Sequence, residues 1–123
     1  MTGKEKKMEN EKVFAMRFSK VYSCLIQKAE RKNRSRDEVF EVTSWLTGYS
    51  VQELEEMLNS DISYGDFFRN APAIHPNSTL IKGRICGVKI EDIEDPLMRK
   101  MRYLDKLIDE LAKGKGMDKI LRK

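Results

Sequence analysis

The sequence predicts an all-α protein, a compact single-domain bundle of five to seven short helices around a long C-terminal helix. Three observations predict this fold. Apolar residues recur at helical spacing along most of the chain, residues suited to helix N-caps precede several of these segments, and only three prolines interrupt the 123 residues. A chain of this length can bury one hydrophobic core.

The first amphipathic segment spans residues 18–32. Its apolar residues fall on one face of a helix because they are spaced by three or four positions: Phe18, Val21, Tyr22, Leu25, Ile26 and Ala29. Residues 1–12 are polar and mixed in charge, so we expect a flexible leader there and one helical domain over residues 13–123.

Two capping boxes predict the next two helices. In a capping box, an N-cap Ser is followed three residues later by Glu, and both side chains satisfy free backbone N–H groups. Ser35 with Glu38 begins a helix that ends before Gly48, a residue that tolerates a left-handed helix end. Ser50 with Glu53 begins a short helix over residues 51–59.

The middle of the chain has weaker signals. Ser63 with Asp66 predicts a further helix start, and the following residues 71–79 contain two prolines, which predict a loop or a single turn. Residues 80–90 include two glycines and β-branched residues, a composition that allows one short hairpin near residues 82–90 and also allows helical turns.

Asp95 followed by Pro96 marks the start of the longest helix, with Asp at the N-cap and Pro at the first helical position. The helix runs to Ala112, and its apolar residues alternate in steps of four and three: Leu97, Met101, Leu104, Ile108 and Leu111. Gly114 and Gly116 make residues 114–123 a glycine-jointed basic tail. Its three apolar residues favour docking on the chain's own core or on a homodimer mate.

The net charge is +4, from 24 Lys and Arg residues against 20 Asp and Glu residues. The excess lies in the tail, residues 113–123, and a second basic cluster lies at residues 28–36. This distribution argues against a nucleic-acid-binding body. The helix over residues 51–59 carries three glutamates and no basic residue, which argues against specific DNA readout by a helix-turn-helix.

Cysteine and apolar patterns indicate the compartment. Cys24 and Cys86 are too few for a disulfide framework. No secretory leader is visible, and no apolar stretch approaches the ~20 residues of a membrane span. We therefore expect a cytoplasmic protein with free thiols that does not bind membranes.

Metal and cofactor motifs are missing from the sequence. Cys24, His75 and Cys86 have none of the spacings of zinc ligands. The acidic run over residues 91–95 lacks the glycine and the distant glutamate of a calcium loop, and suits the positive end of the following helix. We expect no metal and no cofactor, and we assign no catalytic residue.

A small-molecule pocket is one hypothesis for the remaining polar and aromatic residues. An aromatic lining with a few polar groups is typical of such pockets. The candidate lining residues are Trp45, Tyr49, His75, Arg84, Cys86 and Lys100. Each also has a purely structural interpretation, as a core aromatic, a loop histidine, a buried thiol or a lysine whose stem packs, and the ligand stays unknown.

Three functions are compatible with these patterns. The first is a non-catalytic binding or protein-interaction module, with a protein partner or a homodimer mate. The second is a nucleic-acid-associated protein that uses the basic clusters at residues 28–36 and 113–123. The third is a thiol-dependent enzyme with Cys86 as nucleophile and His75 as base.

Four strings carry a resemblance to a known family. They are residues 45–49 (WLTGY), 85–88 (ICGV), 91–98 (EDIEDPLM) and 102–115 (RYLDKLIDELAKGK). With them, the chain from Phe14 to Lys123 resembles the domain of unknown function 2200 family of short bacterial proteins. The resemblance implies a mainly helical single domain, and it assigns no activity, cofactor or functional residue.

Overall fold

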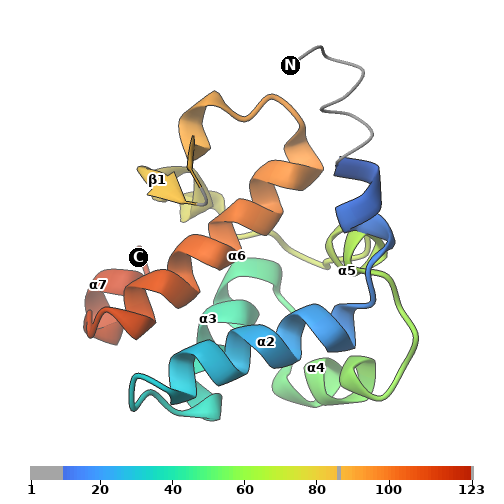
Figure 1. Cartoon of the computed structure of the whole chain (residues 1–123), viewed down its shortest axis with the longest axis horizontal. Helices are drawn as coiled ribbons and strands as arrows, with labels where there is room; N and C mark the ends of the chain where they lie inside the picture. The colour runs from blue at the N-terminus through green and yellow to red at the C-terminus, as the bar shows by residue number, and fades with distance from the viewer. Residues whose placement is uncertain (1–9, 86, 123) are drawn as a thin grey trace.

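A computed structural model describes residues 10–85 and 87–122. Residues 10–15 are helical, and the elements that follow are α2 (Phe18–Glu30), α3 (Arg36–Thr47), α4 (Val51–Leu58), α5 (Tyr64–Arg69), the 3-10 turn η1 (Pro76–Leu80), β1 (Arg84–Ile85), β2 (Val88–Lys89), the 3-10 turn η2 (Ile90–Asp92), α6 (Pro96–Ala112) and α7 (Met117–Ile120). The predicted mainly helical fold is confirmed (Figure 1).

The predicted helix starts are confirmed because each depends on local chemistry. Ser35 and Ser50 both form complete capping boxes, in which the serine hydroxyl accepts the N–H of the glutamate three residues later. Ser63 caps α5 in the same way, without the reciprocal glutamate. Asp95 accepts two backbone N–H groups at the start of α6.

Helix α6 is the centre of the bundle. It packs against α2, α3, α5, α7 and β1, and Figure 1 shows it crossing the molecule diagonally. Met101, Leu104, Ile108 and Leu111 are buried, as the alternating steps of four and three predict. None of the helices in the described ranges is long and apolar enough to cross a membrane.

An aromatic cluster joins α2 to α5. The ring of Phe18 stacks on Tyr22 at 4.8 Å and on Phe67 at 4.1 Å, measured between ring centroids. The hydroxyl of Tyr22 is 2.7 Å from that of Thr43 on α3, so the buried phenol group is hydrogen-bonded. Close offset stacking of this kind fixes the short helix α5, whose six residues could not be stable alone.

The short hairpin near residues 82–90 is present, and it lies between two helical turns, because Leu80 ends η1 and Ile90 begins η2. β1 and β2 are antiparallel, with Arg84 opposite Lys89 and Ile85 opposite Val88. Most of the predicted flexible leader lies outside the described residues, but residues 10–12 belong to a helix. Val13 and Phe14 pack on the core and hold this helix in place, and the division into a leader and one domain stays a prediction.

Candidate functional site

Trp45 and His75 come together in the structure, as the pocket hypothesis required of them. Their rings stack with centroids 4.3 Å apart and planes 20° apart. The loop that carries His75 is held to α3, because the His75 N–H donates to the carbonyl of Leu46 at 3.0 Å. The His75 Nδ1 accepts the N–H of Asn77 at 3.0 Å, which leaves Nε2 as the protonated nitrogen of the neutral ring.

The other pocket candidates have different surroundings. Tyr49 is buried, and its hydroxyl donates to the carbonyl of Phe67 at 2.7 Å, so this residue packs in the core. Arg84 is exposed on the hairpin, and Lys100 is half-buried on α6. Cys86 lies outside the described residues. The ligand pocket, and a role for Cys86 in it, stay predictions.

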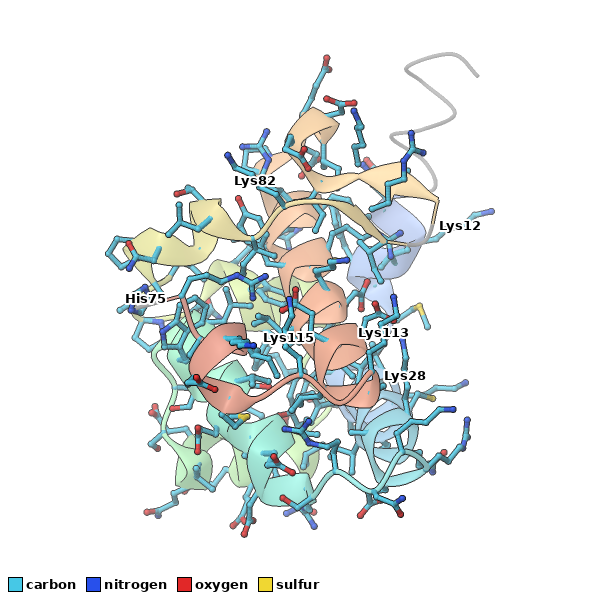
Figure 2. The ribbon with its side chains drawn as sticks, turned by 90° about the vertical axis from the view of Figure 1, so that its left-hand side faces the viewer. Lys12, Lys28, His75, Lys82, Lys113 and Lys115 are labelled. Carbon is cyan, nitrogen blue, oxygen red and sulfur yellow. The ribbon has the colours of Figure 1, made fainter. Side chains whose placement is uncertain are left out.

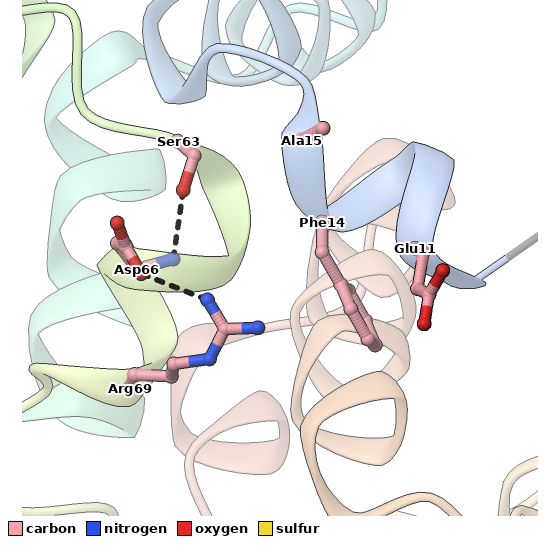
Figure 3. Close-up of a pocket in the computed structure, with 6 residues that line it drawn as sticks. All are labelled: Glu11, Phe14, Ala15, Ser63, Asp66 and Arg69. Carbon is pink, nitrogen blue, oxygen red and sulfur yellow. Dashed lines mark hydrogen bonds and ion pairs between the residues drawn. The ribbon is translucent and has the colours of Figure 1, made fainter. Parts of the chain in front are cut away.

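A shallow hollow of about 240 Å³ lies where the helix at residues 10–15 crosses α5. Figure 3 shows Phe14 facing the guanidinium of Arg69, which lies 5.8 Å from the ring centroid. Arg69 also pairs with Asp66 at 2.8 Å, and both side chains are exposed. The pair between Arg69 and Asp66 leaves Glu11 as the other charged residue that lines this hollow.

A denser set of charges surrounds the last turns of α6. Glu110 is buried, with 7% of its side chain exposed, and Arg122 binds it through two nitrogens at 2.6 and 2.7 Å. Lys115 adds a third contact at 3.3 Å. Burial raises the pKa of Glu110, but these cations outweigh that effect and hold it below its ordinary value. Ile120 and Leu121 are buried beside this pair, so the tail docks on its own core.

The neighbouring carboxylate, Asp109, gathers two more lysines. Lys113 lies 2.9 Å from it and Lys28, at the end of α2, lies 3.5 Å from it. Burial raises the pKa of Asp109, and the two lysines lower it to below its ordinary value. One carboxylate therefore holds together cations from two helices far apart in the sequence.

Arg34 closes this end of the bundle from the α2–α3 connection. It is mostly buried, pairs with Glu38 at 2.7 Å, and donates to the carbonyl oxygens of Leu111 and Lys115. Carbonyl groups at a helix C-terminus lack partners within the helix, so Arg34 supplies them. The hydrogen bond from Arg34 also holds the pKa of Glu38 below its ordinary value.

The result is a surface on which the cations are exposed and their acidic partners are covered. The exposed fraction of the side chain is 72% for Lys113, 44% for Lys28 and 43% for Lys115, against 16% for Asp109. Figure 2 shows these three lysines side by side over the end of α6. We call this surface the basic end and define it as Lys28, Arg31, Lys32, Lys113, Lys115 and Lys119.

An acidic surface lies on α4. Residues 37–68 contain eight acidic residues and no Lys or Arg. Four acidic residues on and just after α4 are exposed, and we call them the acidic face: Glu53, Glu55, Glu56 and Asp61. Figure 1 shows α4 to the right of α3, away from the α2–α3 connection and α7.

The family model described as an uncharacterized protein conserved in bacteria (DUF2200) matches residues 12–122. The chain belongs to the DUF2200 family. The expected family membership is therefore confirmed over nearly the whole chain.

A solved structure supports the same fold. The crystal structure of uncharacterized protein SP1917 is 51% identical, has a TM-score of 0.87, and covers 90% of this chain and 91% of that one. No curated protein matches the chain significantly. Neither likeness brings an activity with it.

Sequence reasoning missed the roles of Arg34 and Glu110 and the contact between the two basic clusters. The carboxylates of the acidic face were visible in the sequence as acidic residues that balance the basic cluster at residues 28–36, and residues 37–68 contain no cation. The contacts of Arg34 had no signal, since they join residues about 80 positions apart. Within residues 10–85 and 87–122, no three His, Cys, Asp or Glu side chains lie together as the ligands of a metal ion would.

Proposed function

We propose that this protein is a non-catalytic interaction module whose basic end binds an acidic protein partner. The observation that supports the proposal is the difference in exposure between the lysines of the basic end and the carboxylates beneath them. The covered carboxylates fix the positions of the lysines, and the exposed ammonium groups make the electrostatic potential of this surface positive. Such a surface attracts an acidic partner and orients its approach.

The second candidate, association with nucleic acid, has its own supporting observation. Docking of the tail places Lys115 against Arg34, so the basic clusters at residues 28–36 and 113–122 share one surface. Three exposed acidic residues interrupt that surface: Glu30, Asp37 and Asp118. A phosphate backbone would meet these carboxylates as well, whereas a protein partner can place its own acids between them.

A pull-down with two charge variants separates these functions. The bait is the wild-type chain, the basic-end variant Lys32→Glu/Lys119→Glu, or the control Lys12→Glu/Lys82→Glu, which changes the net charge equally. All four lysines are exposed, and Figure 2 shows Lys12 and Lys82 apart from the basic end. The prey is a lysate of bacteria that express the untagged chain, with and without nuclease.

We expect the wild type and the control to retain protein after nuclease treatment, and the basic-end variant to lose it. Retention that disappears with nuclease would favour the nucleic-acid function. Equal retention by the basic-end variant and the wild type would contradict both functions, because both use the same lysines.

A further inference from the structure

We infer that the acidic partner of the basic end is a second copy of this chain, which presents the α4 acidic face. The inference rests on the proposed function and names its partner. It predicts a head-to-tail contact, because the two surfaces that meet are different surfaces of the same molecule.

Part of the positive charge of the basic end is not paired within the described part of the chain. The lysines at Asp109 and Glu110 are already paired, but Arg31, Lys32 and Lys119 are exposed, and no ion pair involves them within the described part of the chain. Arg31 and Lys32 lie on the α2–α3 connection, and Lys119 lies on α7. The hydrogen bond from Arg34 to the carbonyl of Lys115 ties that connection to the segment just before α7.

The acidic face has the complementary property. In the described ranges, its four carboxylates take part in no ion pair, and Glu55 and Glu56 point outward from a helix whose inner side is held by Leu54. Val51, at the start of the same helix, is 46% exposed although it is apolar. An exposed valine beside exposed acids is the composition of a small contact surface with a polar rim.

The two surfaces cannot satisfy each other within one molecule. The basic end lies at the C-terminal end of α2, and α4 lies towards the start of α2, where the Phe18 N–H donates to the carbonyl of Ile62 at 2.9 Å. The 13 residues of α2 form a rigid spacer of about 20 Å. At 0.1 M salt, charges separated by more than about 10 Å are largely screened from each other.

A second copy satisfies both surfaces at once. It carries unneutralised carboxylates for the basic end and unneutralised cations for the acidic face, which gives charge complementarity without any further partner. Because the contact is heterologous, each molecule bound leaves one surface of each kind exposed, and association continues unless a ring closes.

Sedimentation of the purified chain at low and high salt tests the inference. We expect the wild type to associate reversibly at low salt and to dissociate at high salt. The basic-end variant Lys32→Glu/Lys119→Glu and the acidic-face variant Glu55→Lys/Glu56→Lys should each raise the apparent dissociation constant about tenfold or more. The control Lys12→Glu/Lys82→Glu should match the wild type.

Mixing the two surface variants provides the decisive comparison. An equimolar mixture should recover association, because the acidic-face variant keeps the basic end and the basic-end variant keeps the acidic face. Circular dichroism checks that each variant is folded. A wild type that stays monomeric at low salt, or a mixture that does not recover association, would overturn the inference.

Failure of this inference differs from failure of the proposed function. If the wild type is monomeric while pull-down retention still depends on Lys32 and Lys119, the acidic partner is another protein and only the inference is wrong. If neither association nor retention depends on these lysines, the proposed function is wrong as well.

Discussion

The guanidinium of Arg34 donates a 2.7 Å hydrogen bond to the carbonyl oxygen of Lys115, which lies 81 positions further along the chain. The same group donates to the carbonyl of Leu111 at 3.3 Å and is oriented by Glu38. The planar guanidinium group can donate hydrogen bonds to a carboxylate and two carbonyl oxygens at the same time, whereas a lysine ammonium on a flexible side chain cannot keep this geometry.

Replacement of Arg34 by lysine should therefore destabilise the protein by ~1.5–3 kcal/mol, the range for hydrogen bonds that involve a charged group. Urea unfolding measures the change. Arg31→Lys is the matched control, because Arg31 is exposed on the same connection. Equal stability of the two variants would show that Arg34 does not hold the tail.

Leu104 lies at the centre of α6 and is fully buried. Leu104→Ala should lower the free energy of unfolding by ~2–5 kcal/mol, through lost burial and the cavity left behind. Leu80→Ala is the control, since the side chain of Leu80 is exposed and its loss should change stability by less than ~0.5 kcal/mol. An unchanged thermal midpoint for Leu104→Ala would contradict the central role of α6.

Gly48 ends α3 with a φ of +81° and lies against the backbone of Ala73, where a Cβ would come within 2.9 Å of the Ala73 nitrogen. Gly48→Ala should destabilise the fold by more than the ~1–2 kcal/mol of a left-handed alanine alone. Gly114→Ala isolates that conformational cost, because Gly114 has a φ of +87° and open space around it. Thermal unfolding should rank the Gly48 variant clearly below the Gly114 variant.

The ionisation of Glu110 makes the free energy of unfolding depend on pH in the acid range. Its pKa is below the ordinary value of 4.5 in the folded chain, so the folded state binds the proton less readily than the unfolded state. Its contribution is complete above pH 4.5 and is lost as the pH falls through the lowered pKa. Glu110→Gln should lower stability near pH 7 and flatten its decline in acid, measured by urea unfolding at several pH values.

Glu55→Gln is the control for this pH series, because Glu55 is exposed on α4. Its curve should follow that of the wild type. If Glu110→Gln and Glu55→Gln show the same decline in acid, the pair between Glu110 and Arg122 does not contribute to acid stability.

Local chemistry made much of the fold predictable. The caps at Ser35, Ser50 and Asp95 act within three residues, and the spacing of apolar residues in α6 gave its buried side directly. The sequence could not decide between a hairpin and helical turns near residues 82–90, because glycine and β-branched residues are compatible with both. Its pairing depends on contacts with α6, where the Lys106 ammonium donates to the carbonyl of Arg84.

The candidate site was harder to predict from the sequence, because it depends on contacts between distant segments. The stacking of His75 on Trp45 could be hypothesised, but the hydrogen bond that brings the loop to α3 joins backbone groups and leaves no trace in side-chain patterns. The basic clusters were visible in the sequence as separate charges. Their union depends on how α7 folds back on α6, which only the packed structure provides.

The stack between Trp45 and His75 gives the molecule an optical reporter. Trp45 is the single tryptophan and His75 the single histidine of the sequence. Release of the loop would remove the imidazole from the face of the indole and change the surroundings that set its emission, so light from Trp45 reports whether the loop at residues 71–75 stays on α3. Excitation at wavelengths that the four tyrosines do not absorb can thus follow that one loop without any label.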